Sequence, residues 1–281
     1  LFRSPVLAGL SAPYPAFLRQ VSLRTADLMA QWQAVGFSHG VMNTDNMSIL
    51  GLTLDYGPFG FLDAFDPGFV CNHSDTGGRY AFDQQPDVGA WNVTKLAQAL
   101  VPLMSVEAAS AAIQDYPQIF SRAYVARMTA KFGLVPDADA LSLILDALNL
   151  LAANRVEYTN FFRRLCDFDS TPGAPNAPVR DLFLDRESFD FWAARYAGAL
   201  RETGVPDAER RTALRAVNPK YILRNHLAEL AIRRAADQRD YSEVARLHAL
   251  LTRPYDEQPE FEAYAAEPPD WARKIEVSCS S

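Results

Sequence analysis

The stretch VGFSHGVMNTDNMSILGLTLDYGPFGF, residues 35–61, holds most of the side chains that could carry chemistry. Its first part, residues 38–46, is polar and shows neither helical nor strand periodicity, so we expect a loop there. Two short apolar runs follow at 47–50 and 52–55, and they pivot on Gly51. This pattern predicts a small β hairpin directly after the loop.

The sequence on both sides of this stretch is mainly helical in pattern. Apolar residues recur at helical spacing in residues 14–35, and Gly36 follows as a stop signal. Further helices are predicted at 91–104, 106–132, 137–155, 158–166, 187–203, 207–217, 220–236 and 241–252. Residues 56–90, rich in Gly and Asp, predict a long irregular loop of the kind that is usually functional, and the Pro-rich residues 167–180 predict a surface linker. We therefore expect a mainly α fold.

Length and composition exclude several classes of protein. With 281 residues, of which 49% are hydrophobic and 22% charged, the chain can bury a core without disulfides, and intrinsic disorder is excluded. A net charge of -7 argues against a dedicated nucleic-acid binder, which usually shows a concentrated basic face. The longest apolar run, residues 141–153, falls short of the ~20 residues that span a bilayer. We expect neither a nucleic-acid nor a membrane partner.

The order of polar residues in 39–57 is typical of kinase-type phosphoryl transfer. Such enzymes use a catalytic-loop Asn and a following Asp-aromatic-Gly to hold the metal that bridges the nucleotide phosphates. Here Asn46 and the motif Asp55-Tyr56-Gly57 have that layout. The usual catalytic base two residues after the His is replaced by Val41, which cannot accept a proton. A carboxylate does stand next to the Asn, at Asp45.

Several strings together resemble one family. These are residues 35–61, FDPGFVCNHSD (65–75), GRYAFDQQP (78–86), NPKYILRNHLAE (218–229) and the terminal Cys-Ser-Ser. They are similar to the selenoprotein O / YdiU family, which has a protein-kinase-like pseudokinase fold. Members of that family are protein adenylyltransferases: they move AMP from ATP onto Ser, Thr or Tyr hydroxyls of proteins and release pyrophosphate. The resemblance thus implies a nucleotidyltransferase that uses ATP, with Mg²⁺ or Mn²⁺ as cofactor.

The resemblance also implies residue roles. It makes Asp45 the proton acceptor, Asn46 a metal ligand, and Asp55 a metal ligand that also contacts ATP. In non-selenoprotein members a Cys stands three residues from the end, and Cys279 matches that place. Because Cys71 lies in the activation-like loop, a reversible Cys71–Cys279 disulfide is a further hypothesis.

Structural alternatives accompany these assignments. Asp45, Asn46 and Asp55 are ordinary turn residues as well as candidate functional ones. His39 has no partner in sequence that would make it a base, so we expect a packing role. Cys166 falls on the apolar side of a helix, and we expect a small core residue.

We predict two domains and a missing part. Residues 1–166 would form a kinase-like C-terminal lobe with catalytic loop 38–46, metal motif 55–57 and activation-like loop 56–90, and residues 167–281 a helical extension. A kinase-type site also needs a β-rich lobe with a glycine loop and a Lys. No G-x-G-x-x-G occurs, and all four lysines follow the metal motif. We therefore expect a fragment that lacks the N-terminal lobe and is inactive alone.

Two other functions remain open. A conventional protein kinase would transfer the γ-phosphate of ATP, although Val41 argues against it. A non-catalytic pseudokinase binding module would bind a partner without chemistry. The resemblance implies a cytoplasmic protein if the source is bacterial and a mitochondrial one if it is eukaryotic.

Overall fold

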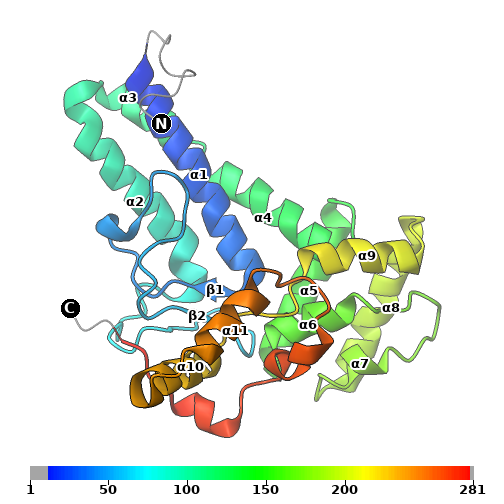
Figure 1. Cartoon of the computed structure of the whole chain (residues 1–281). Helices are drawn as coiled ribbons and strands as arrows, with labels where there is room; N and C mark the ends of the chain where they lie inside the picture. The colour runs from blue at the N-terminus through cyan, green and yellow to red at the C-terminus, as the bar shows by residue number, and fades with distance from the viewer. Residues whose placement is uncertain (1–11, 279–281) are drawn as a thin grey trace. The chain divides into compact units, whose positions relative to one another are not determined.

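The computed structural model describes residues 12–278, apart from the side chain of Arg273, and this part of the chain is mainly helical, as predicted (Figure 1). Its first helices are α1 (Pro13–Val35), α2 (Gln85–Leu100), α3 (Val106–Ile113) and α4 (Tyr116–Phe132). The later ones are α5 (Ala138–Asn154), α6 (Tyr158–Leu165), α7 (Ala177–Arg180), α8 (Arg186–Glu202), α9 (Asp207–Val217), α10 (Asn225–Gln238) and α11 (Ser242–Leu251). Short 3-10 helices lie at Thr44–Asn46, Phe82–Gln84, Val101–Leu103, Pro259–Ala265 and Asp270–Lys274. None of the described helices is both long and apolar enough to cross a membrane.

The predicted hairpin at residues 47–50 and 52–55 is wrong. Within residues 12–278 the strands are β1 (Phe37–Ser38) and β2 (Gly60–Phe61), which form a two-stranded sheet. The polar groups of the predicted runs go to other partners instead. The Leu54 carbonyl bonds to a histidine ring at 2.8 Å, and the Thr53 hydroxyl accepts a hydrogen bond from Trp32 at 2.9 Å. A strand pair needs backbone groups such as the Leu54 carbonyl for its own ladder.

Three predicted helices also differ from the structure. The one expected over 220–236 is α10 and begins only at Asn225, because the N–H groups of Lys220 and Tyr221 bond to the Pro254 carbonyl instead. The helix expected from residue 91 begins at Gln85, because Pro86 stands in its first turn, where a fixed φ suits the helix. The helix expected over 106–132 is two helices, α3 and α4, separated by a turn at 114–115. The Ser105 hydroxyl accepts a hydrogen bond from the Ala108 N–H and caps α3. Helices α5, α6, α8 and α9 lie within two residues of their predicted bounds.

The described residues form two compact units. Unit 1 comprises residues 12–59, 68–127 and 277–278, and unit 2 comprises 60–67 and 128–276. The predicted division at residue 166 stays a prediction.

Unit 1 is built on the packing of α1, α2 and α3, which lie together in Figure 1. Leu18 of α1 is fully buried and packs with Ala97 of α2 and with Ala109 and Ala112 of α3. Small residues on α2 and α3 let the helix axes approach closely. Helix α1 ends where Gly36 takes a left-handed conformation and its N–H bonds to the Trp32 carbonyl. The chain then enters the loop that holds the candidate site.

Unit 2 has an aromatic core. Rings of α4, α6 and α8 pack edge to face or stacked, with Phe132 between Phe162, Trp192 and Tyr196 at centroid distances of 5.2 to 6.4 Å. The polar atoms of these rings are satisfied inside the core: the Trp192 N–H donates to the Leu143 carbonyl, and the Tyr196 hydroxyl to the Phe132 carbonyl. Aromatic ring pairs of this kind stabilise the fold by more than the burial of their apolar area alone.

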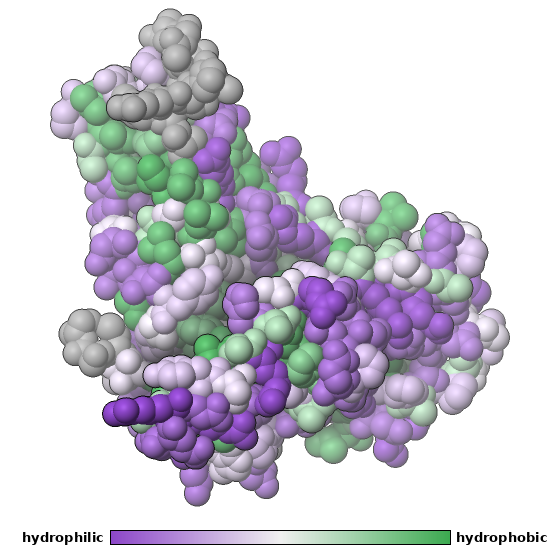
Figure 2. Space-filling view, in the orientation of Figure 1, coloured by the Kyte–Doolittle hydropathy of each residue, from purple (hydrophilic) through white to green (hydrophobic). Residues whose placement is uncertain are grey.

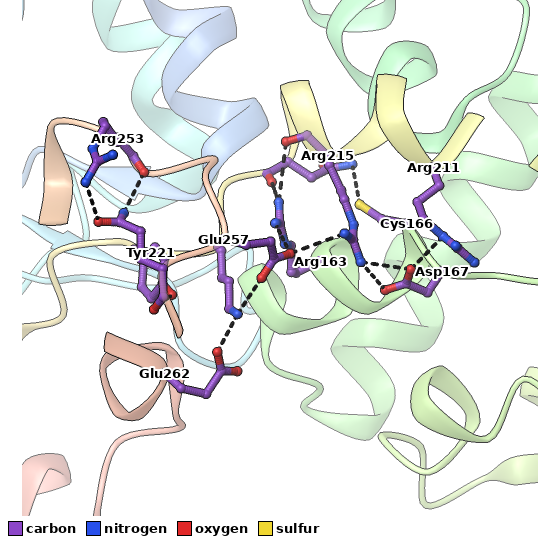
Figure 3. A network of polar contacts seen from close by, with 12 residues as sticks. Arg163, Cys166, Asp167, Arg211, Arg215, Tyr221, Arg253, Glu257 and Glu262 are labelled. Atoms are coloured by element: carbon purple, nitrogen blue, oxygen red, sulfur yellow. Dashed lines mark hydrogen bonds and ion pairs between the residues drawn. The ribbon is translucent and has the colours of Figure 1, made fainter. Parts of the chain in front are cut away.

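An ion network connects side chains of α6 and α9 to Glu257 (Figure 3). Arg163 of α6 contacts Glu257 at 2.5 Å, and Lys220 contacts the other carboxylate oxygen of Glu257 at 2.7 Å. Arg215 of α9 reaches Asp167 at 3.0 Å. Hydrogen bonds from Lys220 and Arg163 hold the pKa of the Glu257 carboxyl at about 2, although partial burial opposes this. The network joins residues near 257 to α6 and α9.

Cys166, at the end of α6, is 2% exposed, which confirms the prediction that it is a small core residue.

Lys131 is a buried cation without a carboxylate partner in the described part of the chain. It is 4% exposed, and its Nζ lies 4.0 Å from the ring centroid of Phe162 and 5.8 Å from that of Tyr158. Burial lowers the pKa of Lys131 to about 7. The folded protein therefore binds fewer protons than the unfolded chain between about pH 7 and the ordinary lysine value, and stability rises with pH in that window.

Replacement of Lys131 by Met, which has similar volume, should raise the free energy of unfolding at pH 7 by a few kcal/mol. The gain should shrink by about 1.4 kcal/mol for each pH unit up to pH 10, because the wild-type protein becomes more stable relative to its unfolded chain as the pH rises through this window. Urea unfolding at several pH values measures this, with the exposed Lys274→Met as a control that should show no such slope. A gain in stability that does not change with pH would contradict the conclusion that burial of the Lys131 amine causes the effect.

Candidate active site

The candidate catalytic loop belongs wholly to unit 1 and follows α1 and β1. Gln85, at the start of α2 and fully buried, fixes its beginning with both ends of one amide. The Gln85 Nε2 donates to the Phe37 carbonyl at 2.9 Å, and its Oε1 accepts from the His39 N–H at 2.9 Å. One side chain thus sets the path of residues 37–39.

His39 is a packed residue, which confirms the packing role predicted for it. It is 1% exposed, and its ring lies 5.3 Å from that of Trp32. Burial lowers the pKa of His39, so the ring is neutral at pH 7. The ring Nε2, as the protonated nitrogen, donates to the Leu54 carbonyl at 2.8 Å. His39 therefore positions the residue before Asp55 and is not free to act as a base.

Gly40 is required by two independent features. Its φ is +82°, a left-handed value that side chains disfavour. A Cβ there would also lie 2.6 Å from the Pro58 carbonyl oxygen and 2.7 Å from Cys71 Sγ. The chain can pass between residues 58 and 71 only without a side chain at this position.

Three side chains hold the remainder of the loop. The Tyr80 hydroxyl donates to Asn43 Oδ1 at 2.6 Å, and Asn92 Nδ2 of α2 donates to the Met42 carbonyl at 2.9 Å. Asn46 Nδ2 donates to the Val41 carbonyl at 3.1 Å. The loop closes on a 3-10 turn, Thr44–Asn46, with Asp45 exposed.

Asp55 lies in a strained turn. Its φ is +58°, which is uncommon for a residue with a side chain and tolerated best by Asn and Asp. The Gly57 N–H bonds back to the Asp55 carbonyl at 2.8 Å, and Tyr56 packs on Phe59 with ring centroids 5.4 Å apart. Such backbone strain occurs most often at functional sites.

The oxygen atoms predicted to bind metal are available. Since Asn46 uses its Nδ2 for Val41, its Oδ1 remains, and it meets no donor in residues 12–278. The carboxylates of Asp45 and Asp55 likewise have no hydrogen-bond or ion-pair partner in that range. Amide and carboxylate oxygens are the ligands that Mg²⁺ takes. No three His, Cys, Asp or Glu side chains among the described residues lie together in a metal-binding group. Oxygens of a bound nucleotide would have to complete the coordination.

Cys71 contacts the start of the same loop. It is buried, and the Ser38 hydroxyl donates to its Sγ at 3.3 Å. The neighbouring Asn72 pairs with Val277 as a parallel β-bridge, and the His73 N–H donates to the Val277 carbonyl at 2.8 Å. Cys279 itself lies outside the described residues, so the predicted disulfide stays a prediction.

In unit 2 a buried ion group anchors the segment that follows the metal motif. The Arg224 side chain is 1% exposed and contacts Asp63 at 2.7 Å and Glu157 at 2.8 Å. Backbone bonds join the same segment to α6, because the Tyr158 N–H donates to the Asp63 carbonyl. Burial raises the pKa of Glu157, and the Arg224 charge offsets part of this. Residues 63 and 64 are thereby fixed to α6 and to the start of α10.

The sequence interpretation missed Gln85, Asn92 and Tyr80. Each contacts a loop 37 to 50 residues away in sequence, which spacing alone does not reveal. A signal did exist for two of them. Gln85 and Asn92 lie two helical turns apart on the face of α2 that buries Val88 and Val93, and polar residues on a buried face need partners.

Comparison with known proteins identifies the family of this chain. Residues 5–252 match the family model described as "Protein adenylyltransferase SelO". The chain belongs to the SelO family. Proteins named "Protein nucleotidyltransferase YdiU" are similar over 99% of the chain: 78% identical in Thiobacillus denitrificans, 54% in Cupriavidus pinatubonensis and 55% in Thioalkalivibrio sulfidiphilus. This SelO-family chain spans 56–57% of the length of these curated relatives.

Substitution of Gly40 by Ala in this SelO-family chain should cost about 2 kcal/mol or more, because both the backbone and its neighbours must move. The free energy of unfolding from urea denaturation measures the loss. Gly77→Ala is the control, since a Cβ at Gly77 meets nothing within 4 Å and its φ is not left-handed. Equal stability of the Gly40→Ala and Gly77→Ala variants would show that a side chain at position 40 is tolerated, contrary to this prediction.

Substitution of Arg224 by Leu should cost about 3–5 kcal/mol, because it leaves Glu157 buried without its partner. The exposed pair Arg233–Glu229 offers the control: Arg233→Leu should change stability by less than about 0.5 kcal/mol. Thermal or urea unfolding compares them. A small effect of Arg224→Leu would show that water, and not the ion pair, satisfies Glu157.

Proposed function

We propose that this chain supplies the acceptor-activating and metal-binding half of an ATP-dependent protein adenylyltransferase, which moves AMP to Ser, Thr or Tyr hydroxyls and releases pyrophosphate. One observation carries the proposal: an exposed carboxylate without a partner in residues 12–278, Asp45, stands beside Asn46 at the turn of a rigidly held loop. The kinase base position holds Val41, which is buried. The family description and the names of the relatives support this class of reaction.

The reaction balances with the groups present. Asp45 accepts the proton of the acceptor hydroxyl. At the same time the oxygen of that hydroxyl forms a bond to the α-phosphorus of ATP. The bond from the α-phosphorus to the oxygen that bridges the α- and β-phosphates breaks, and pyrophosphate leaves with the electron pair of that bond. An exposed carboxylate without a partner in residues 12–278 can approach the acceptor hydroxyl and take up its proton in the transition state.

Asn46 and Asp55 would hold Mg²⁺ or Mn²⁺, and a bound metal ion neutralises charge on the phosphates. His39 holds the carbonyl before Asp55, and Gln85 holds His39. These contacts keep the two ligand-bearing segments in place before a nucleotide binds, which is the preorganisation that such chemistry needs. The proposal also gives unit 1 the role of the C-terminal lobe of a kinase-like fold.

The remaining ATP-binding groups belong, in this proposal, to a part of the protein outside the 281 residues. Kinase-type sites use a glycine loop and a Lys for the phosphates. This chain has no such loop, and its lysines lie at positions 95, 131, 220 and 274. The isolated chain should therefore transfer little or no AMP.

The test compares ATP labelled at the α-phosphate with ATP labelled at the γ-phosphate. The enzyme is a chimera of this chain with the part of the Thiobacillus denitrificans relative that lies outside the match. We expect label on protein only from the α-position. Transfer from the γ-position would establish a kinase, and transfer of neither label would leave a binding module.

Variants of the chimera separate chemistry from folding. Asp45→Asn should lower AMP transfer by about 10²–10⁴-fold, because a proton acceptor is lost, with the unfolding midpoint unchanged. Asp83→Asn, an exposed Asp in the 3-10 turn before α2, is the matched control and should keep full activity. Unchanged activity of Asp45→Asn would refute its role.

A further inference from the structure

Asn43 begins the turn that carries Asp45, and its side chain contacts a residue far away in the sequence. Its backbone is extended, as at an N-cap, and its carbonyl accepts the Asn46 N–H at 3.0 Å. An Asn in this position normally turns its side-chain oxygen onto an N–H of the turn itself. Here the side chain makes no such cap, and Oδ1 accepts the Tyr80 hydroxyl at 2.6 Å instead. The turn is therefore tied to a residue 37 positions further along the chain.

Residues 43–45 are the exposed part of the candidate catalytic loop. The backbone before them is held, because Asn92 Nδ2 of α2 donates to the Met42 carbonyl. Figure 2 shows hydrophilic residues at the surface where the blue loop of unit 1 lies in Figure 1. Among the side chains of residues 43–45, only that of Asn43 makes a hydrogen bond within the described part of the chain. The contact with Tyr80 is thus the side-chain hydrogen bond that fixes the exposed turn.

Tyr80 is itself held at its backbone and at its ring. The two carboxylate oxygens of Asp75 accept the N–H groups of Arg79 and Tyr80, at 3.0 and 2.8 Å. The Arg79 guanidinium lies 5.6 Å from the ring centroid of Tyr80 and 4.8 Å from that of Trp91 on α2. A guanidinium at these distances is attracted to aromatic rings. The hydroxyl therefore reaches Asn43 from a segment that is anchored on α2.

We propose that Tyr80 is a positioning residue for Asp45: through Asn43, its hydroxyl sets where the carboxylate on the exposed turn stands. The inference rests on the proposed function, in which Asp45 takes the proton of the acceptor hydroxyl. Proton transfer needs the carboxylate within hydrogen-bond reach of that hydroxyl, and a small displacement of a catalytic group lowers the rate strongly. Residues 75–80 of the activation-like loop thereby affect the rate, although they include neither the proton acceptor nor the candidate metal ligands.

Tyr80→Phe in the chimera used for AMP transfer removes the hydroxyl and keeps the ring beside Arg79. We expect kcat for AMP transfer to fall about fivefold, as the loss of one hydrogen bond implies, with the KM for ATP and the unfolding midpoint unchanged. Asn43→Ala removes the other partner and should lower kcat by the same factor, and the double variant should lower it no further. Tyr241→Phe is the matched control and should keep full activity, since Tyr241 is 65% exposed. Full activity of Tyr80→Phe would overturn the proposal.

Asp45→Asn separates positioning of the proton acceptor from a general loss of structure. If Tyr80 acts through Asp45, Tyr80→Phe should lower kcat no further in a chimera that already carries Asp45→Asn. The effects of independent residues would instead multiply. A further fivefold fall in the Asp45→Asn background would show that Tyr80 acts elsewhere, which overturns the inference.

Amide hydrogen exchange in the 281-residue chain tests the same link without ATP. The Asn46 N–H is protected by its bond to the Asn43 carbonyl. Tyr80→Phe should raise the exchange rate of this N–H about fivefold, because the turn opens more often. The Gly51 N–H, which bonds to the Ser48 carbonyl, should exchange at an unchanged rate. Equal exchange of the Asn46 N–H with and without the hydroxyl would overturn the proposal.

The two experiments together separate this inference from the proposed function. Loss of AMP transfer by Asp45→Asn together with full transfer by Tyr80→Phe overturns the inference alone. Full transfer by Asp45→Asn refutes the proposed function, and the exchange rate of the Asn46 N–H then still decides whether Tyr80 fixes the turn.

Discussion

The rest of unit 1 depends on the amide of Gln85. This side chain is fully buried and joins the first turn of α2 to the backbone at residues 37 and 39. His39 extends the connection through its ring to the Leu54 carbonyl. Hydrogen bonds of Gln85 and His39 therefore connect α2, through the candidate catalytic loop, to the residue before Asp55. Both segments that carry candidate metal ligands take their positions from one helix.

A buried polar chain of this kind favours one arrangement strongly. Each member is satisfied only when all the others are in place, and a buried amide or imidazole without its partner is costly. An apolar residue in place of Gln85 could fill the same space, but it would leave the Phe37 carbonyl and the His39 N–H unsatisfied. The rigidity of the loop thus comes from polar groups at the core of unit 1, while the helices around it pack through ordinary apolar contacts.

The sequence predicted the elements whose determinants are local. Helix α1 could be predicted because its apolar period, its first-turn Pro and its terminal Gly36 all agree. The hairpin prediction failed because composition alone does not show that the His39 ring, earlier in the chain, takes the Leu54 carbonyl. The residues of the candidate site could be named from their motif. The side chains that hold them, Gln85, Asn92 and Tyr80, lie too far along the chain to be found by spacing.

The position of the candidate base follows from burial. Residue 41 is 8% exposed, between two backbone groups that Asn46 and His39 engage. A carboxylate there would lose its hydration, and such burial raises the pKa of a carboxyl group. Asp45 stands four residues later on the exposed side of the 3-10 turn. The loop can therefore keep Val41 as a core residue and still present a carboxylate at the surface, because the turn at Thr44–Asn46 carries the chain from buried to exposed positions. In the proposed function Asp45 supplies the proton acceptor that a kinase carries two residues after the His, and Val41 packs at that position instead.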